Sequence, residues 1–475
     1  MFKSLKAQTL LYAIAKYATV AVGIVISAIL SRLLTPSDYG VVAVVTVFTT
    51  LFSTLCNVGL STAVVQRQDL SEDQVNDIFS FSVYLSFALM FIFMLCAYPI
   101  SSFYGNTVYV PVCHYLSLSV LFNSLNMIPN AVLMKKQLFQ LVSIRMVVCA
   151  ILSGAVAIVM AFMGFKYYAL VTQSVLSALI NFVWNMHNAN LKMKIKFSMA
   201  PLKSVGSYSI NQFLYNICNY FAQNLDNMLT GKLISSEALA YYNKSYTLTR
   251  YPINNIPHVI TPILHPVLAK HQDEPKYIYD NYLKIVKLLS LLGVYISIAF
   301  YFAGEELIYL FFGSQWDLAV TPFKILSICV WAQMVNALAG SIYQSLGKTK
   351  EMFHSGIIHI SISIICIIIG SVARDINILA LFVCVSFNIK FFVESVYLVR
   401  KSFGYKLLPY YKHFLPDLLI CVGVVIISLV AFRLYTPERM FISFCYKMLI
   451  ISAAFLVGLI ITGEYKKVLT VLKKK

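Results

Sequence analysis

Charged side chains are scarce in this chain. Asp, Glu, Lys and Arg make up 12% of its 475 residues, whereas about a quarter is usual in soluble globular domains. Hydrophobic residues make up 59%, and the mean hydropathy is +0.77. This deficit of charge excludes a soluble globular domain and predicts an all-α protein that crosses the membrane many times.

Three other features are missing. The ten cysteines stand singly in apolar runs without a CxxC pair, a pattern typical of small buried side chains rather than of disulfides or a metal site. No loop between apolar runs exceeds about twenty residues, and no phosphate-binding glycine loop occurs. The sequence therefore predicts no soluble catalytic or nucleotide-binding domain, no metal and no cofactor, and it places the activity inside the bilayer.

Apolar runs are long enough to cross a bilayer, which takes about 20 helical residues. They predict about fourteen transmembrane helices. The expected spans are 9–34, 41–66, 78–102, 109–134, 142–164, 167–189, 205–232, 238–268, 284–312, 319–346, 354–373, 376–399, 414–433 and 443–463.

The net charge of +18 follows the predicted loops. With the N-terminus inside, about 25 of the 37 Lys and Arg residues fall in or beside cytoplasmic segments and about 7 in or beside outer ones. Lys192, Lys194, Lys196 and Lys203 share one inner loop. The pattern predicts cytoplasmic termini and contact with anionic membrane lipid, and it argues against a nucleic-acid partner.

A repeat divides the chain. "SRLLTPSDYG" at 31–40 aligns with "GKLISSEALA" at 231–240, and "FYG" at 103–105 aligns with "FFG" at 311–313. We expect two parallel-repeat six-helix bundles, 1–200 and 201–410, followed by two further helices and a basic cytoplasmic tail in 411–475. Transporters of this design hold substrate between two lobes that rock against each other.

The predicted seventh span carries one continuous polar face. Its members recur every three or four residues, as on one side of an α-helix. The first span has a similar stripe of polar and small residues. Such faces line a wet cavity or join packed helices, and six polar groups in a row favour the cavity. They are Gln212, Asn216, Asn219, Gln223, Asp226 and Thr230 in the seventh span, and Tyr12, Lys16, Thr19, Gly23 and Ser27 in the first.

Cations outnumber carboxylates within the predicted spans. Burying a cation at the bilayer centre costs about 2.5 to 3.5 kcal/mol, so each cation needs water, a partner or the surface. Lys390 and Glu394 have the i, i+4 spacing of a local pair, and Lys324 can reach the outer surface. The cations that remain are Lys16, Lys244 and Arg250, with Asp226 as one partner.

This positive surplus predicts an anionic substrate, because ammonium and guanidinium groups suit phosphate oxygens. The candidate cavity residues are therefore Lys16, Lys244 and Arg250 for phosphate, with Asn216, Asn219, Gln223, Tyr242 and Tyr246 for sugar. Asp226 either carries a proton or balances Lys16. Prolines recur in the eighth span, where they are expected to bend or locally unwind the helix; Pro252, Pro257 and Pro262 are the candidate hinge.

Several motifs resemble a known family. "AILSRLLTPSDYGVVAVVTVF", "NVGLSTAVVQRQDL", "NLDNMLTGKLISSEALAYYNKSYTL", "ITPILHPVLAKHQDEP" and "LFFGSQWDLA" are similar to the polysaccharide transporters of Wzx and TuaB type in the multidrug/oligosaccharidyl-lipid/polysaccharide (MOP) flippase superfamily. The likeness runs from about residue 5 to 400. It implies two bundles around a central cavity in the bacterial plasma (inner) membrane. It also implies export of a polyprenyl (undecaprenyl) pyrophosphate-linked oligosaccharide for surface polysaccharide, alongside glycan polymerase partners.

Other functions remain open at this stage. A drug or organic-cation antiporter of the same superfamily predicts surplus carboxylate in the cavity, and a membrane glycan polymerase or ligase predicts a long outer loop. A scaffold gives no reason for the polar stripes. The prediction is a flippase, not an enzyme, driven by proton, sodium or membrane potential.

Overall fold

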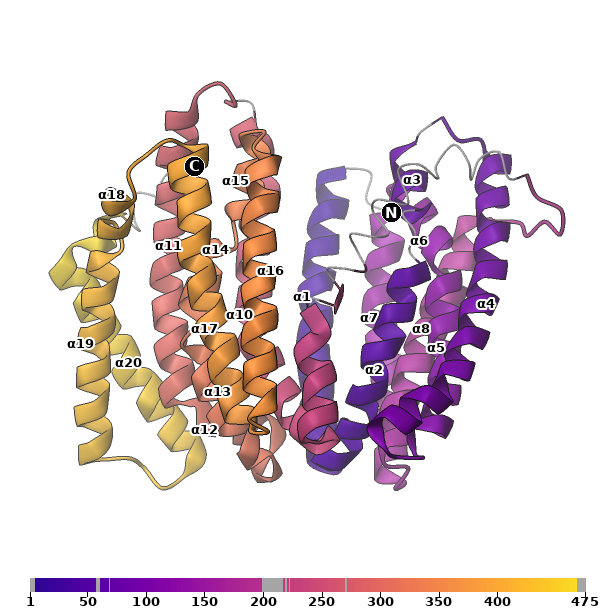
Figure 1. Ribbon diagram of the computed structural model, residues 1–475, viewed down its shortest axis with the longest axis horizontal. Coiled ribbons are helices and arrows are strands. Elements are labelled where there is room, and N and C mark those ends of the chain that lie inside the picture. The colour runs from indigo at the N-terminus through magenta and orange to yellow at the C-terminus, as the bar shows by residue number, and fades with distance from the viewer. Residues whose placement is uncertain are drawn as a thin grey trace. The chain divides into compact units, whose positions relative to one another are not determined.

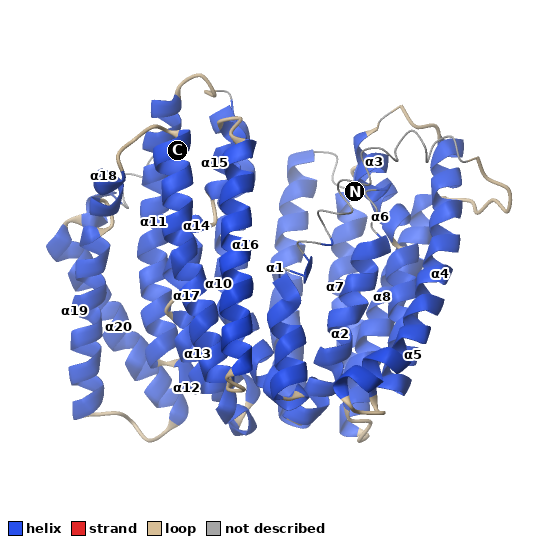
Figure 2. Ribbon diagram, in the orientation of Figure 1, coloured by secondary structure: helices blue, strands red, loops and turns tan. Residues whose placement is uncertain are grey.

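The protein is built from helices. The computed structural model describes residues 5–56, 60–67, 69–198, 217, 220–221, 223–269 and 271–467, and within these ranges there are helices and loops but no strand (Figure 2). The chain forms two compact units, Met1–Ala240 and Tyr241–Lys475 (Figure 1). The sequence repeat predicts a boundary near residue 200, whereas these compact units divide after Ala240.

The first unit contains α1 to α8 and the start of α10. Apolar side chains of α1, α2, α4, α5, α7 and α8 form one core, and a second core lies where α3 and α6 meet α4 and α8. The helices are α1 (Leu5–Leu33), α2 (Pro36–Cys56), α3 (Leu60–Gln66), α4 (Glu72–Tyr104), α5 (Tyr109–Leu125), α6 (Met127–Lys135), α7 (Phe139–Phe162), α8 (Tyr167–Ala189), the π-helix η1 (Thr230–Ile234) and α10 (Ser236–Ala269).

The second unit contains the rest of α10 and the later helices. One core joins α11, α14, α17 and η3, and another joins α11 to the last two helices. The elements are α11 (Pro275–Phe302), α12 (Gly304–Phe312), the 3₁₀ helix η2 (Ser314–Ala319), α13 (Val320–Ser327), α14 (Val330–Asn336), α15 (Ala339–Ser345), α16 (Thr349–Val372), α17 (Ile376–Ser395), the π-helix η3 (Val396–Ser402), α18 (Leu407–Lys412), α19 (Leu415–Leu434) and α20 (Met440–Thr462).

The multi-pass prediction is confirmed, although its count of fourteen is not. Among the described residues eleven helices are long and apolar enough to cross a membrane, and one bent pair makes a twelfth. Of the two other predicted spans, 205–232 lies largely outside the described residues. The other, 238–268, corresponds to α10. This helix is long enough to cross a membrane but is not apolar enough to count among the candidate spans.

The bent pair corresponds to the predicted span 319–346. The chain turns by 49° between Ser314–Ser327 and Val330–Ser345. At the break, Ser327 Oγ donates to the Lys324 carbonyl at 2.6 Å and Cys329 Sγ to the Leu326 carbonyl at 3.1 Å. Both bonds reach carbonyls three residues back, and such side-chain bonds can compete with the helical backbone pattern at this break.

The aligned decapeptides are helix caps. Thr35 precedes α2, and the Asp38 N–H donates to its Oγ1 at 3.2 Å while the Asp38 carboxylate accepts the Thr35 N–H at 3.0 Å. Two hundred residues later Ser235 precedes α10 and accepts the Ala238 N–H at 2.9 Å. Each repeat therefore uses a hydroxyl side chain to satisfy a backbone N–H group at the start of its second helix.

The two capped turns pack against each other within the first unit. A Cβ atom on Gly40 would lie 2.3 Å from the Ser236 carbonyl oxygen, so only glycine fits there. Nearby, the Tyr104 hydroxyl donates to the Met228 carbonyl at 3.3 Å, and the Lys232 ammonium lies 4.7 Å from the Phe103 ring centroid. These contacts place the chain up to Ala240 in the first compact unit.

Gly40→Val should lower the stability of the protein by about 1 to 3 kcal/mol, because two backbone segments must separate to admit the side chain. Gly23→Val in α1 is the control, since a Cβ there meets nothing within 4 Å. Thermal unfolding of the purified variants in detergent measures both. Equal midpoints for the two variants would contradict the close packing.

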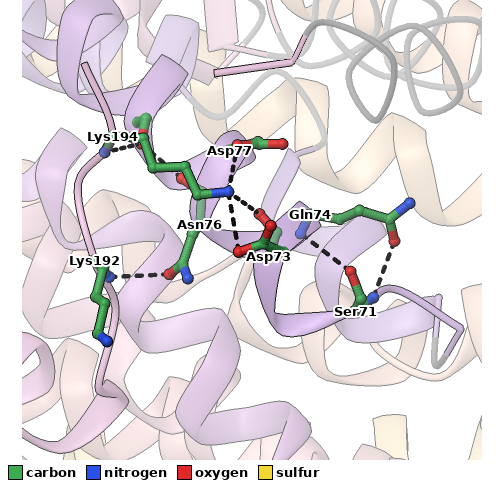
Figure 3. A network of polar contacts seen from close by, with 8 residues as sticks. Ser71, Asp73, Gln74, Asn76, Asp77, Lys192 and Lys194 are labelled. Carbon is green, nitrogen blue, oxygen red and sulfur yellow. Dashed lines mark hydrogen bonds and ion pairs between the residues drawn. The ribbon is translucent and has the colours of Figure 1, made fainter. Parts of the chain in front are cut away.

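The lysine-rich loop after α8 is tied to the start of α4 (Figure 3). The Lys194 ammonium lies 2.9 Å from Asp77 Oδ1 and 3.1 Å from Asp73 Oδ1, and the Lys192 N–H donates to Asn76 Oδ1 at 2.9 Å. The hydrogen bond to Asp77 holds the pKa of Lys194 above its ordinary value. Lys194 therefore binds protein carboxylates, and contact of this loop with anionic lipid stays a prediction.

Asp77→Asn should release this loop and speed tryptic cleavage after Lys192, Lys194 and Lys196, because the neutral amide loses the charge-assisted bond. Asp73→Asn is the matched control. Its carboxylate touches the same ammonium but is 85% exposed, so we expect little change. Cleavage is followed in detergent by mass spectrometry, and equal rates for both variants would rule out an anchoring role for Asp77.

Two buried ion-pair clusters fix α20 to the second unit. Lys287 of α11 lies 2.5 Å from Asp417 of α19 and 3.3 Å from Glu464, just beyond α20; these three side chains are 4%, 1% and 2% exposed. Near the start of α20, Lys447 pairs with Glu306 of α12. The last two helices are thus joined to the bundle by charge as well as by apolar packing.

Candidate functional site

A ladder of aromatic rings on α10 positions one cation of the second unit. Tyr242 and Tyr246 are one helical turn apart, and their rings stack with centroids 5.7 Å apart. Arg250 lies one turn further on, with its Cζ 5.2 Å from the Tyr246 centroid. Stacking on an aromatic face holds the guanidinium plane in place and leaves its edge free to bind an anion.

A second cation lies near Arg250. The expected Lys390–Glu394 pair is not formed, because no ion pair within 4.0 Å joins these residues of α17 where the structure describes them. Lys390 lies close enough to both Glu394 and Arg250 to interact electrostatically. The Glu394 carboxylate is 7% exposed and lies beside the hydroxyls of Tyr343 and Ser355.

Arg250, Lys390 and Glu394 therefore form a basic cluster with two cations and one carboxylate. Within a low-dielectric interior the net positive charge attracts an anion more strongly than it would in water. Sequence reasoning missed Lys390 because its i, i+4 spacing to Glu394 suggested a closed local pair. In the structure Lys390 interacts with Glu394 without a direct ion pair, and it also interacts with Arg250 of a different helix.

Lys244 lies on a different face of α10 from Arg250. Its ammonium is 4.6 Å from the Phe312 ring centroid and 5.1 Å from that of Trp316, so two aromatic faces hold it inside the second unit. The side chain is buried. Its contact with substrate stays a prediction, and the aromatic cage gives it a clear packing role.

The predicted residues of the first unit are spread along the chain. Lys16 is exposed on α1. Asp226 is buried just before η1, where its Oδ1 accepts the Asn227 N–H at 2.8 Å. Gln223 is exposed, whereas Asn216 and Asn219 lie outside the described residues. The choice between proton carrier and charge balancer for Asp226 stays a prediction.

The proline-rich segment remains helical. α10 continues without interruption from Ser236 to Ala269 and includes Pro252, Pro257 and Pro262. Local unwinding, one of the two expected outcomes, does not occur in this conformation. A hinge role for these prolines stays a prediction.

Arg145 in α7 is a buried cation that sequence reasoning missed. It is 8% exposed, and one guanidinium nitrogen donates to Asn130 Oδ1 at 2.9 Å and to Asn185 Oδ1 at 2.7 Å. Its place at the start of a predicted span suggested a topology signal only. The amide side chains of Asn130 and Asn185 in the neighbouring helices α6 and α8 were the feature of the sequence that could have indicated a polar cluster here.

Among the described residues no group of three or more His, Cys, Asp or Glu side chains is arranged to hold a metal ion. The side chains of the basic cluster offer a ligand positive charge, hydrogen bonds and an aromatic face.

Solved structures identify the fold. The lipid II flippase MurJ in an inward closed conformation matches with a TM-score of 0.75 at 13% identity, covering 96% of this chain and 99% of MurJ. An inward-facing multidrug resistance MATE family transporter of the MOP superfamily matches with a TM-score of 0.60 at 14% identity, covering 80% of this chain and 94% of that one. The chain thus has the fold of MOP-superfamily membrane transporters.

The sequence itself supplies the family. The family model described as polysaccharide biosynthesis protein matches residues 29–321, more than half of the chain, and the chain belongs to this family. Teichuronic acid biosynthesis protein TuaB of Bacillus subtilis is 24% identical over 301 residues, 63% of this chain and 62% of TuaB. Lipopolysaccharide biosynthesis protein WzxC of Escherichia coli K12 is 21% identical over 373 residues, 75% of this chain and 73% of WzxC. The chain spans less than two thirds of the length of TuaB.

Proposed function

We propose that this protein is a flippase for a polyprenyl (undecaprenyl) pyrophosphate-linked oligosaccharide in surface polysaccharide biosynthesis. The observation that carries the proposal is the basic cluster, where the two cations Arg250 and Lys390 interact electrostatically and Glu394 lies near Lys390. A diphosphate bridge matches this surplus of positive charge. The names of relatives in teichuronic acid and lipopolysaccharide biosynthesis support the same class of substrate.

The substrate has three parts with different solvation needs. The diphosphate and sugars need polar partners, whereas the prenyl chain is stable in lipid. Arg250 and Lys390 neutralise the diphosphate, and tyrosine and amide groups bond to sugar hydroxyls. The substrate enters from the cytoplasmic leaflet, the two lobes rock against each other, and the headgroup leaves toward the outer leaflet.

Topology and energy supply belong to this proposal. The excess of Lys and Arg in the predicted inner loops favours cytoplasmic termini in the bacterial plasma membrane. A proton, a sodium ion or the membrane potential drives the cycle, and Asp226 is the candidate coupling residue. Glycan polymerases are the expected partners, because they consume the exported repeat unit.

A deletion strain tests the function directly. We expect undecaprenyl pyrophosphate-linked oligosaccharide to accumulate and the surface glycan to disappear, with both restored by the wild-type gene. Mass spectrometry of the extracted lipids identifies the trapped sugar. Unchanged lipid intermediates together with altered tolerance of drugs or organic cations would replace the proposal with the antiporter alternative.

A further inference from the structure

A polar cavity lies in the first unit, apart from the basic cluster of the second. It has a volume of about 220 Å³, room for roughly seven water molecules. Except for Met127, its lining side chains end in amides or hydroxyls. They come from α2, α3, α5 and α6 and from the short α5–α6 connection, and they are Ser53, Ser61, Asn123, Ser124, Asn126, Met127 and Asn130.

A buried guanidinium fixes the orientation of two of these amides. Arg145 has only N–H donors, so the Asn130 atom that faces it must be the oxygen. Asn185 accepts from Arg145 in the same way, and its own amino group therefore donates to Asn126 Oδ1 at 2.7 Å. The oxygens of Asn126 and Asn130 are thus both engaged on the Arg145 side.

The amino groups of these two amides are available to a ligand. Both side chains line the cavity and are partly exposed, and neither Asn126 Nδ2 nor Asn130 Nδ2 donates a hydrogen bond to another described residue. The Ser124 hydroxyl and Nε of Arg145, by contrast, are fully buried without a partner among the described residues. A buried polar group without a partner is destabilising by about 1 to 3 kcal/mol, so a ligand that accepts a hydrogen bond from the Ser124 hydroxyl is favoured.

Charge points to the same class of ligand. Arg145 has no carboxylate within 4.0 Å among the described residues, so its positive charge is solvated only by neutral amides. An unpaired buried cation stabilises an anion placed near it. A purely structural arginine in a helical bundle gains more from a carboxylate partner than from two asparagines.

We propose that this cavity binds an oxyanion of the transported substrate, either a phosphate of the diphosphate bridge or a carboxylate of an acidic sugar. Asn126, Asn130 and Ser124 donate to its oxygens, and Arg145 supplies the charge behind them. The proposal rests on the flippase function above. It assigns the first unit an anion subsite of its own, separate from Arg250 and Lys390.

Binding is tested on the full-length protein in nanodiscs at low ionic strength. Isothermal calorimetry uses sodium pyrophosphate and sodium glucuronate as probes. Asn130→Asp keeps the oxygen that accepts from Arg145 but replaces the amino donor with a negative oxygen. We expect about a ten- to hundredfold loss of probe affinity at this site, the effect of one charge-assisted hydrogen bond.

Two variants keep the test interpretable. Asn188→Asp adds the same charge to α8 at a residue that bonds only to the Trp184 carbonyl among described groups, and it should bind both probes like the wild type. Asn126→Asp makes the equivalent change on the other amide and replaces Asn130→Asp if that variant does not fold. Because the carboxylate introduced by Asn130→Asp would pair with Arg145, the melting temperature of that variant should stay the same or rise.

The pattern of probes identifies the source of the oxyanion. Loss of pyrophosphate binding alone assigns the diphosphate, and loss of glucuronate binding alone assigns a sugar carboxylate. Wild-type affinity for both probes in Asn130→Asp, or no binding by the wild type, overturns the subsite. Failure of the wild-type gene to clear lipid intermediates in the deletion strain would instead refute the flippase function, because calorimetry does not depend on export.

Discussion

Lys287→Met is expected to destabilise the protein by about 3 to 5 kcal/mol and to detach α19 and α20 from the second unit. The ammonium of Lys287 is the cation shared by Asp417 and Glu464, and all three side chains are almost fully buried. Removing it leaves two carboxylates in an apolar interior without their main partner, and breaking a buried pair in this way is strongly destabilising.

Hydrogen bonds around this cluster add to the expected loss. Ser290 Oγ of α11 donates to Asp417 at 2.5 Å and accepts the Trp331 indole N–H at 2.8 Å, so a displaced Asp417 also disturbs the contact between α11 and α14. Thermal unfolding and limited proteolysis between α18 and α20 measure the effect. Intrinsic fluorescence should report it as well, because Trp331 lies in the affected network.

Matched variants separate charge from volume. Lys467→Met removes another contact of Glu464, but its side chain is 57% exposed, so a loss below about 1 kcal/mol is expected. Combining Lys287→Met with Asp417→Leu and Glu464→Met should recover most of the stability, since apolar residues often replace a whole buried ion cluster without loss. If Lys287→Met alone were as stable as the wild type, the buried ion cluster would not contribute to the stability of the protein.

Arg250→Ala combined with Lys390→Ala is expected to lower export about a hundredfold or more. Each cation makes charge-assisted contacts worth about 1.5 to 3 kcal/mol with an anionic ligand, and tenfold corresponds to about 1.4 kcal/mol. Because the variant also leaves the buried Glu394 carboxylate without a cation, some loss of stability is expected, and thermal unfolding in detergent separates it from the loss of export. Lipid-linked intermediates in the complemented deletion strain provide the measurement.

Lys324→Ala is the control for this double variant. Lys324 is also a cation of a predicted span, but it is partly exposed and lies 3.9 Å from Glu305, so its removal should leave export intact. Arg250→Lys with Lys390→Arg keeps the charge and should retain part of the activity. Export at the wild-type level in the double alanine variant would remove the basic cluster from the transport mechanism.

The membrane helices could be predicted well from the sequence because their signal is local. Apolar length alone placed 109–134 within a residue of the observed span Tyr109–Lys135, which α5 and α6 form together, and placed 167–189 at the bounds of α8. The cap residues Thr35 and Ser235 were visible as a repeat before their role was known. The exceptions are segments where polarity or side-chain bonding competes with the pattern, such as α10 and the break after Ser327.

The electrostatic sites could not be predicted as well, because they depend on helices far apart in sequence. Spacing on one helix predicted a direct Lys390–Glu394 pair, but it could not show that α10 also brings Arg250 within electrostatic reach of Lys390. The surplus of cations within predicted spans grouped Lys244 with Arg250, but it could not show the rings of Phe312 and Trp316 that lie against Lys244. A single sequence contains these residues but not the distances between them.

The pairing of α20 has a consequence for biosynthesis. Lys287 and Glu306 are translated and inserted more than a hundred residues before Asp417, Lys447 and Glu464, the groups that neutralise them. Lys287 gains Asp417 when α19 is inserted, but Glu306 stays without Lys447, and Lys287 without Glu464, until the ribosome has delivered α20. Insertion of α20 is therefore the step that completes both clusters, and a nascent chain truncated before Lys447 leaves the Glu306 carboxylate without its cation.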